Sequence, residues 1–380
     1  MTLDETEISE WTVDAVLHYA RLKAAENRRV FESVESEILG GMSTLLTDRD
    51  RACVMQMLKE LIFEVVSAIQ NQLPVATDTH DLEDETLKSL SINRSMEVFE
   101  CLFSNRPLCG SALIEEAVMQ LCITSAEQIV KRGGDKLRLR GSDPEQDLLA
   151  LLPGLPPNSS IRHRVQNVQP SDTGRRDPFN NPVLYLKELN PQMRFSLVWR
   201  VAAAFEWCLA RHTDDVITSV DTALEQAAAN LLENTDSGGP GVSALVETEL
   251  HDVESIDPRT YAAILRTGDF KMFEALIAHA TGIEVALIRR LLFEDGGVGV
   301  LVLSKVLNLD ESDIEFISDV ATAASGHIFT PNSAEARTVL GPRNGISTDS
   351  ANKVCAYWKR GTQYQRAIWE VRSAHNPLAM

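Results

Sequence analysis

The sequence lacks the features that mark a metal centre, a secreted protein or a membrane protein. Its six cysteines include no Cys-x-x-Cys pair and its eight histidines are scattered, whereas a zinc site needs clustered ligands. Several cysteines fall in apolar runs, which is typical of buried thiols in a reducing compartment. No run approaches the roughly 18 apolar residues of a membrane span. The chain starts with acidic residues, unlike a signal peptide. We therefore expect a cytoplasmic protein with no metal or cofactor.

Positive charge is also scarce. The formal net charge is −19 over 380 residues, and this disfavours non-specific binding to nucleic acid or to an anionic membrane. The length allows two or three domains, and the hydrophobic content of 44% is sufficient for real cores. Composition therefore favours a protein partner over a nucleic acid or a membrane.

A local pattern occurs twice in the chain. Residues 189–191 read Leu-Asn-Pro and residues 205–212 read Phe-Glu-Trp-Cys-Leu-Ala-Arg-His. After nearly the same interval, residues 256–258 (Ile-Asp-Pro) are followed by residues 273–279 (Phe-Glu-Ala-Leu-Ile-Ala-His). Self-similarity at a fixed offset is typical of stacked supersecondary units whose apolar faces cover one another. In both copies an N-cap side chain before proline indicates a helix start. The pattern predicts an all-α fold of helical-repeat, HEAT-like or solenoid-like helix pairs in two blocks.

Residues 1–132 are expected to form an N-terminal helical domain. Residues 47–50 (Thr-Asp-Arg-Asp) have the form of a capping box, in which side chains bond the free N–H groups of a helix start. The helix that follows carries apolar residues at helical spacing, namely Val54, Leu58, Leu61, Ile62, Val65 and Ile69. Proline, basic residues and glycine are helix-stop signals. The predicted boundaries are a stop at Leu73-Pro74, a second helix at Arg94–Ser104, and a third from Ser111 to the Lys-Arg-Gly-Gly run at 131–134.

Residues 133–182 differ from the helical segment before them, because they are rich in proline, glycine, serine and asparagine and show little helical periodicity. We expect a linker here, with one short helix around Gln146–Leu152. Between Lys131 and Arg176 there are nine Lys or Arg against five Asp or Glu. This segment is therefore predicted to be a basic, proline-rich linker in an acidic chain.

Residues 183–325 are predicted to form a helical-repeat domain. Residues 267–269 (Thr-Gly-Asp) are expected to end one helix and cap the next, and Thr281-Gly282 to end that next helix. The glutamate of each Phe-Glu pair is interpreted as facing solvent, including Glu274. The predicted apolar face of this helix consists of Phe270, Phe273, Ile277 and Ala280.

The run of motifs in residues 256–309 resembles a known bacterial family. It reads Asp-Pro, a short helix, Thr-Gly-Asp-Phe, Phe-Glu-Ala-Leu, Thr-Gly-Ile, Leu-Ile-Arg-Arg-Leu-Leu and Asp-Gly-Gly-Val-Gly. This order is similar to that of the domain of unknown function 2336. Residues 47–51, with the helix after them, look like the upstream helix of that family. The resemblance is good over 256–309, loose over most of the rest of 47–325, and departs at the linker and the C-terminal tail. It implies an all-helical fold and carries over no catalytic residue.

Residues 326–380 are predicted to form a C-terminal tail that is loop-rich and then helical from about Ser350. Four of the ten Trp and Tyr residues of the chain lie here within thirteen positions. Between Lys353 and Arg372, five Lys or Arg oppose one Glu. The tail could cap the repeat body, anchor a protein partner, or stack on nucleic-acid bases. These aromatic residues are Tyr357, Trp358, Tyr364 and Trp369.

Two patterns suggest chemistry but have simpler structural explanations. The glycine-rich run at 296–299 lacks the preceding strand and the Lys-Ser/Thr order of a phosphate-binding loop, so we interpret it as a tight turn between helices. His212 and His279 each have acidic neighbours in the sequence and could form acid–base pairs. Because both lie near a predicted helix end, where the helix dipole favours imidazolium, a structural role is the preferred interpretation.

The favoured hypothesis is a non-enzymatic bacterial scaffold, adaptor or regulatory protein that binds a protein partner through a helical surface. Self-association is a second option, given the opposite charges of body and tail. The alternative is a sensor for a nucleotide or another anionic ligand. An enzyme is the least supported class, because no set of nucleophile, base and orienting residue is visible. The candidate binding residues are Tyr357, Trp358, Arg360, Tyr364 and Trp369 in the tail and Arg162, Arg164, Arg175 and Arg176 in the linker.

Overall fold

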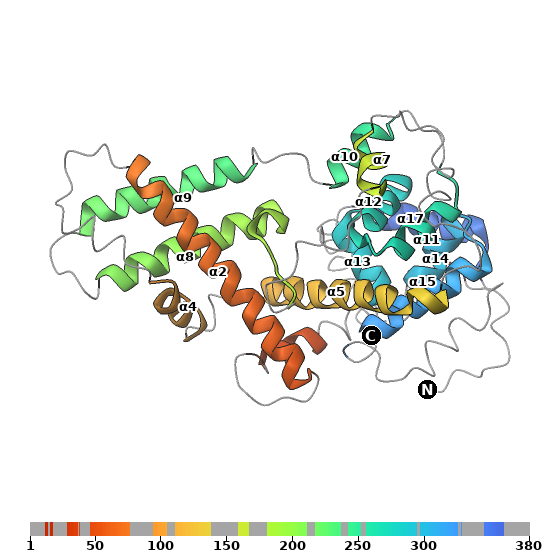
Figure 1. Ribbon diagram of the computed structural model, residues 1–380, viewed down its shortest axis with the longest axis horizontal. Coiled ribbons are helices and arrows are strands. Elements are labelled where there is room, and N and C mark those ends of the chain that lie inside the picture. The colour runs from red at the N-terminus through yellow and green to blue at the C-terminus, as the bar shows by residue number, and fades with distance from the viewer. Residues whose placement is uncertain are drawn as a thin grey trace, which may run out of the picture. The chain divides into compact units, whose positions relative to one another are not determined.

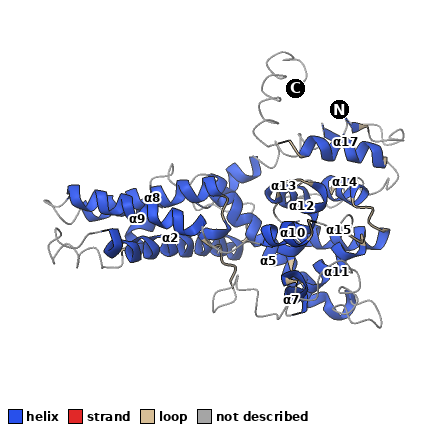
Figure 2. Ribbon diagram, turned by 90° about the horizontal axis from the view of Figure 1, so that it is seen from above, coloured by secondary structure: helices blue, strands red, loops and turns tan. Residues whose placement is uncertain are grey.

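Every regular element among the described residues is a helix, which confirms the predicted all-α class (Figures 1 and 2). The structure is a computed structural model. It describes residues 12–13, 16–17, 29–36, 38, 46–76, 94–104, 111–137, 159–166, 181–210, 217–236, 242–251, 256–294, 297–325, 328 and 346–360. The predicted short helix at Gln146–Leu152 lies outside these residues.

The chain divides into two compact units, each assembled from separate stretches. Unit 1 contains residues 1–29, 122–170 and 240–380, and unit 2 contains residues 30–121 and 171–239. The sequence, by contrast, predicts contiguous segments. The helices of unit 2 are α2 (Asp48–Ala76), α4 (Ser95–Ser104), α8 (Pro191–Ala210) and α9 (Ile217–Asp236), with a 3-10 turn, η1 (Leu186–Glu188).

The helices of unit 1 are mostly shorter. Helix α5 (Ser111–Leu137) runs across the unit boundary in the sequence. The others are α7 (Ser160–Gln166), α10 (Val242–Glu249), α11 (Arg259–Thr267), α12 (Phe270–Thr281), α13 (Val285–Phe293), α14 (Val298–Val306), α15 (Glu311–Ser325) and α17 (Thr348–Trp358).

Unit 2 is built around α2. Thr47 caps this helix: its hydroxyl oxygen accepts a hydrogen bond from the N–H of Asp50 at 3.2 Å. Helix α2 contacts α4, α8 and α9, and α8 also contacts α4 and α9 (Figure 1). The predicted apolar stripe of α2 is its buried face, because Val54, Leu58, Leu61, Ile62, Val65 and Ile69 are all 0% exposed.

In unit 1, helices α11 to α15 pack consecutively, each against the next. Helix α15 also contacts α11 and α13, so these five helices close on themselves. An ion pair joins α11 to α15, with 2.8 Å between Arg266 Nη2 and Asp313 Oδ1. The guanidinium of Arg266 also lies over the ring of Phe316, 4.7 Å from its centroid. Helix α10 packs on α12, and α17 packs on α14.

Several predicted helix signals are confirmed by atomic contacts. Asn190 caps α8, since its Oδ1 accepts from the N–H of Met193 at 2.8 Å, and Pro191 is the first residue of that helix. Gly268 has a φ of 83° and Gly282 a φ of 67°, so both end their helices in the left-handed conformation. Asp269 then caps α12 by accepting from the N–H of Met272.

Three local predictions are wrong. Helix α2 continues past Pro74 to Ala76, and α5 continues through Gly133-Gly134 to Leu137. A proline or glycine costs a helix about 1–3 kcal/mol, and long helices packed in a core withstand that loss. Ala280 is exposed, because no described element covers it in the last turn of α12, where Thr281 is the buried residue.

Candidate functional site

Helix α7 lies inside the segment that the sequence predicts to be an irregular linker. The carboxylate of Glu249, at the end of α10, holds the N-terminus of α7. It accepts hydrogen bonds from the N–H of Ser160 at 2.7 Å and from that of Ile161 at 3.0 Å, and a further one from the hydroxyl of Ser159. Ile161 is fully buried. The basic segment is therefore docked onto unit 1 at this point.

These bonds set the ionisation of Glu249. Burial would raise its pKa, but the hydrogen bonds from Ser159, Ile161 and Ser160 outweigh burial and lower the pKa below the usual range. A carboxylate with a lowered pKa stabilises the fold above its unfolded pKa, and that contribution is lost as the pH falls through the folded pKa. The α7 contact is thus fully formed at neutral pH.

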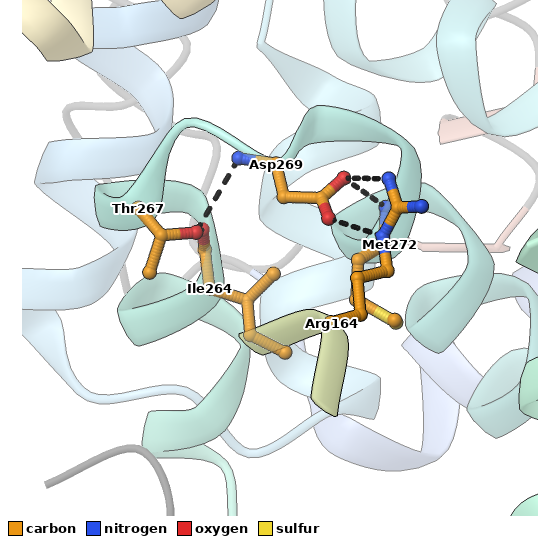
Figure 3. A network of polar contacts seen from close by, with 5 residues as sticks. All are labelled: Arg164, Ile264, Thr267, Asp269 and Met272. Atoms are coloured by element: carbon orange, nitrogen blue, oxygen red, sulfur yellow. Dashed lines mark hydrogen bonds and ion pairs between the residues drawn. The ribbon is translucent and has the colours of Figure 1, made fainter. Parts of the chain in front are cut away.

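A second contact holds the other half of α7 (Figure 3). Arg164 donates from Nε to Asp269 Oδ2 at 2.6 Å and from Nη2 to Asp269 Oδ1 at 3.1 Å, which is a bidentate pair. The same carboxylate caps α12 through Met272. Thr267 supports this corner, because its hydroxyl donates to the carbonyl of Ile264 at 2.7 Å and accepts from the N–H of Asp269 at 3.4 Å. Asp269 therefore joins α7 to the break between α11 and α12.

One of the four linker arginines that were predicted to bind a partner has an internal contact instead. Arg164 is engaged by Asp269. Arg162 lies on α7, but its side chain is outside the described residues, as are Arg175 and Arg176. The structure therefore brings Arg164 into an internal contact and does not gather the four arginines into a described site.

The described part of the tail forms α17, capped by the Ser347 hydroxyl, which accepts from the N–H of Ser350. Trp358 is 5% exposed, and Cys355 lies against the carbonyl of Thr281. Arg360 is exposed and lies over the ring of half-buried Tyr357, 5.6 Å from its centroid. Tyr364 and Trp369 lie outside the described residues. The packing of α17 on α14 agrees with the capping interpretation, and partner binding by the tail stays a prediction.

The acidic neighbours of His279 are held by arginines. Asp269 pairs with Arg164, and Glu274 Oε1 lies 2.8 Å from Nε of Arg289 on α13. Glu274 is 1% exposed, so its predicted solvent-facing position is wrong. The residue faces the α12–α13 contact, where burial is acceptable because Arg289 supplies the opposite charge. These pairs support the structural interpretation of His279; His212 lies outside the described residues.

The described part of the glycine-rich run, from Gly297 onward, lies between α13 and α14. Gly297 has a φ of 94° and precedes the first residue of α14. A Cβ on Gly299 would lie 2.3 Å from the carbonyl oxygen of Leu291, so only glycine fits where these helices meet. Within the described ranges, no helix has the length and apolarity to cross a membrane, and no three His, Cys, Asp or Glu gather as metal ligands.

A surface feature that the sequence analysis missed lies on α8. Phe195 is 58% exposed and Trp207 is 60% exposed. Trp199 is half-buried, and its ring centroid lies 6.0 Å from that of Phe195 in an edge-on arrangement. Ala203 is exposed between the two tryptophans. We call these four residues, each four positions after the last, the α8 aromatic stripe.

A signal for this stripe exists in the sequence. Helix α8 carries apolar residues on every face: Leu197, Val201 and Phe205 are buried in unit 2, while the stripe follows a different face. Helical periodicity predicts one apolar face per helix. A helix that is apolar all round is therefore assigned to the core as a whole. The spacing of Phe195, Trp199 and Trp207 could have shown the second face.

Comparison with known proteins identifies one family. No curated protein and no solved structure matches the chain. Residues 172–339 match the model of a family described as an uncharacterised protein conserved in bacteria (DUF2336), which confirms the predicted resemblance over that part of the chain.

Proposed function

We propose that the chain is a non-enzymatic scaffold or adaptor that binds a protein through a surface of packed helices. The observation that carries this proposal is the α8 aromatic stripe. Exposed clusters of large apolar side chains mark interaction sites, whereas single exposed apolar residues need no explanation. Trp is enriched among the residues that dominate binding energy at protein interfaces.

The shape of the stripe favours a helical partner. Residues four apart on a helix form a ridge that packs into the groove of another helix. A partner with an apolar face at the same spacing would cover Phe195, Trp199 and Trp207 together. The proposed ligand is therefore an amphipathic helix with an apolar face.

The helical-repeat arrangement is part of the same proposal. Consecutive contacts from α11 to α15 support it, because helical repeats stack on their neighbours. The contact between α11 and α15 departs from an open array, in which only neighbours touch. A cytoplasmic site of action is also proposed. Its support is that the described cysteines form no disulfide.

The anion-sensor alternative has weaker support. Its best-placed described arginine, Arg164, is bonded to Asp269 through both carboxylate oxygens. A phosphate would have to displace that carboxylate. The exposed guanidinium of Arg360 is the remaining described candidate.

In-cell photo-crosslinking tests the scaffold proposal. A photoreactive amino acid at position 207 should give a covalent adduct with a protein in the native host, and Phe195→Ala should weaken that adduct. The matched control places the same group at Glu225, which is exposed on α9. Equal adducts from both positions, or none from position 207, would show that the stripe is not a binding surface.

A further inference from the structure

We infer that the α8 aromatic stripe binds the same stripe of a second copy of this chain, with the two α8 helices crossing antiparallel about a two-fold axis. The inference rests on the proposed function and names its partner. It concerns Phe195, Trp199, Ala203 and Trp207, which are described side chains on one helix.

The first argument is self-complementarity. Consider an antiparallel two-fold pair whose axis passes between Trp199 and Ala203. The numbers of any two residues that face each other then add up to the same value. Trp199 of one copy then lies against Ala203 of the other, and the reverse contact occurs on the other side of the axis. Phe195 lies against Trp207 of the second copy in the same way. At the centre a tryptophan therefore meets an alanine, and at each edge a phenylalanine meets a tryptophan.

The second argument is geometry. A row of residues four apart forms a ridge along a helix, and the small side chain of Ala203 leaves a low point in that ridge where Trp199 of a second copy fits. The exposed alanine at the centre permits a close approach of the two helices. A heterologous partner needs a matching ridge of its own, whereas a second copy already has one.

The third argument is the exposed area. An aromatic side chain presents about 150–250 Å², and Phe195 and Trp207 leave 58% and 60% of theirs uncovered. The two rings therefore expose about 200–300 Å² per copy and about 400–600 Å² in a pair. A specific interface needs about 1,000 Å² in total. The rings supply about half of it, and half-buried Trp199 and exposed Gln192 and Ala203 add to it.

Net charge sets the expected salt dependence. Two copies at a formal charge of −19 repel each other, and salt screens that repulsion. An apolar contact between like-charged copies therefore tightens as ionic strength rises. A cationic partner would give the opposite dependence.

The test is sedimentation of the full chain over a range of protein and salt concentrations. The chain should dimerise, and Ala203→Trp should raise the dimer dissociation constant at least tenfold, because two tryptophans then collide at the centre. The double variant Trp199→Ala/Ala203→Trp exchanges the large and the small side chain between positions 199 and 203. It should restore the affinity to within a few-fold of the original, since each tryptophan again meets an alanine.

Two controls keep the result interpretable. Met96→Ala removes an exposed apolar side chain on α4, where Met96 is 47% exposed, and should leave the dimer unchanged. Far-ultraviolet circular dichroism and thermal unfolding of each variant show that the helices are intact. A destabilised double variant would be replaced by Trp199→Val/Ala203→Trp.

Each other outcome overturns the inference in a distinguishable way. A dimer that the double variant fails to restore excludes the antiparallel pairing. A monomer that still gives the adduct from position 207 with a different protein keeps the proposed function and excludes self-association. A monomer whose Trp207 is shielded from a soluble fluorescence quencher has the stripe covered by its own chain, and both proposals then fail.

Discussion

The two copies of the repeated pattern fold into different structures. Residues 189–210 lead into one helix, α8, of 20 residues, whereas residues 256–281 form α11 and α12, of 9 and 12 residues. Their starts are similar but not identical. Asn190 caps α8, and Pro191 is its first residue. Asp257 Oδ1 accepts from the N–H of Arg259 at 2.9 Å, and Pro258 is the N-cap of α11. The shared signals therefore fix where a helix begins but not how far it runs.

One pair of residues accounts for the difference. Gly268 adopts a positive φ and Asp269 caps a new helix, whereas the corresponding part of the first copy, around Arg200 and Val201, is uninterrupted helix. The break lets α12 turn back on α11 and bury Glu274 against Arg289. Without a break, α8 carries a second apolar face along its length. The first copy thus forms one continuous helix, and the second forms two short helices that pack on each other.

The largest expected effects test what the copies share. Phe205 and Phe273 are both 0% exposed, so Phe205→Ala and Phe273→Ala should each cost about 3–5 kcal/mol of unfolding free energy. Urea unfolding followed by circular dichroism measures both. Phe195→Ala, at an exposed position of the same helix as Phe205, is the control and should cost less than about 1 kcal/mol. Similar costs at Phe195 and Phe205 would contradict the assignment of the core face of α8.

The next effect tests where the copies differ. Glu274→Ala should cost about 3 kcal/mol, because it leaves Arg289 largely buried without its partner. Glu206→Ala, at the matching position in α8, should cost less than about 1 kcal/mol, since Glu206 is only half-buried. Adding Arg289→Met to Glu274→Ala should recover part of the loss. Additive losses in that double variant would mean that the pair is not coupled.

A smaller effect tests the break itself. Gly268→Ala should cost about 1–2 kcal/mol, because a side chain is strained at a φ of 83°. The converse substitution, Ala203→Gly in α8, should also cost about 1 kcal/mol, because glycine weakens a continuous helix. Thermal unfolding compares the two. A neutral Gly268→Ala would show that the break does not depend on the left-handed residue.

The smallest effect concerns Asn190 and Asp257 at the two helix starts and depends on pH. Asn190→Ala and Asp257→Ala should each cost about 1 kcal/mol at neutral pH. The pKa of Asp257 is lowered, chiefly by hydrogen bonds from the Arg259 side chain. Its contribution is therefore present above the unfolded pKa of about 3.9 and is lost as the pH falls through the lower folded pKa. Acidification should abolish the stability cost of Asp257→Ala and leave that of Asn190→Ala. Unfolding free energies measured at pH 2–7 check this, and the same pH dependence for both variants would contradict it.

The fold was largely predictable where signals are local. Thr47, Asn190 and Asp269 cap the helices that follow them, and the six apolar residues of α2 form its buried face. Helix ends were less predictable, as Pro74 shows, because tertiary packing can carry a helix past a residue that stops it in isolation. Helix α7 was missed, since its anchor, Glu249, lies far away in the sequence.

The candidate site was less predictable than the fold. The residues singled out for ligand binding were charged or aromatic clusters, yet Arg164 and Trp358 are used inside unit 1. The α8 aromatic stripe was overlooked because exposure depends on which faces the neighbouring helices cover. No pattern within α8 alone distinguishes its core face from its exposed apolar face.

The sequence by itself determined the all-α class, the helix starts and the resemblance to one bacterial family. These follow from hydrogen bonds and periodicities that act within one or two turns of a helix. Only the tertiary structure decided that residues 171–239 join residues 30–121 in one unit, that Glu274 is buried, and that Trp207 is exposed. These depend on contacts between distant segments, because the burial of a side chain is a property of its neighbours in space.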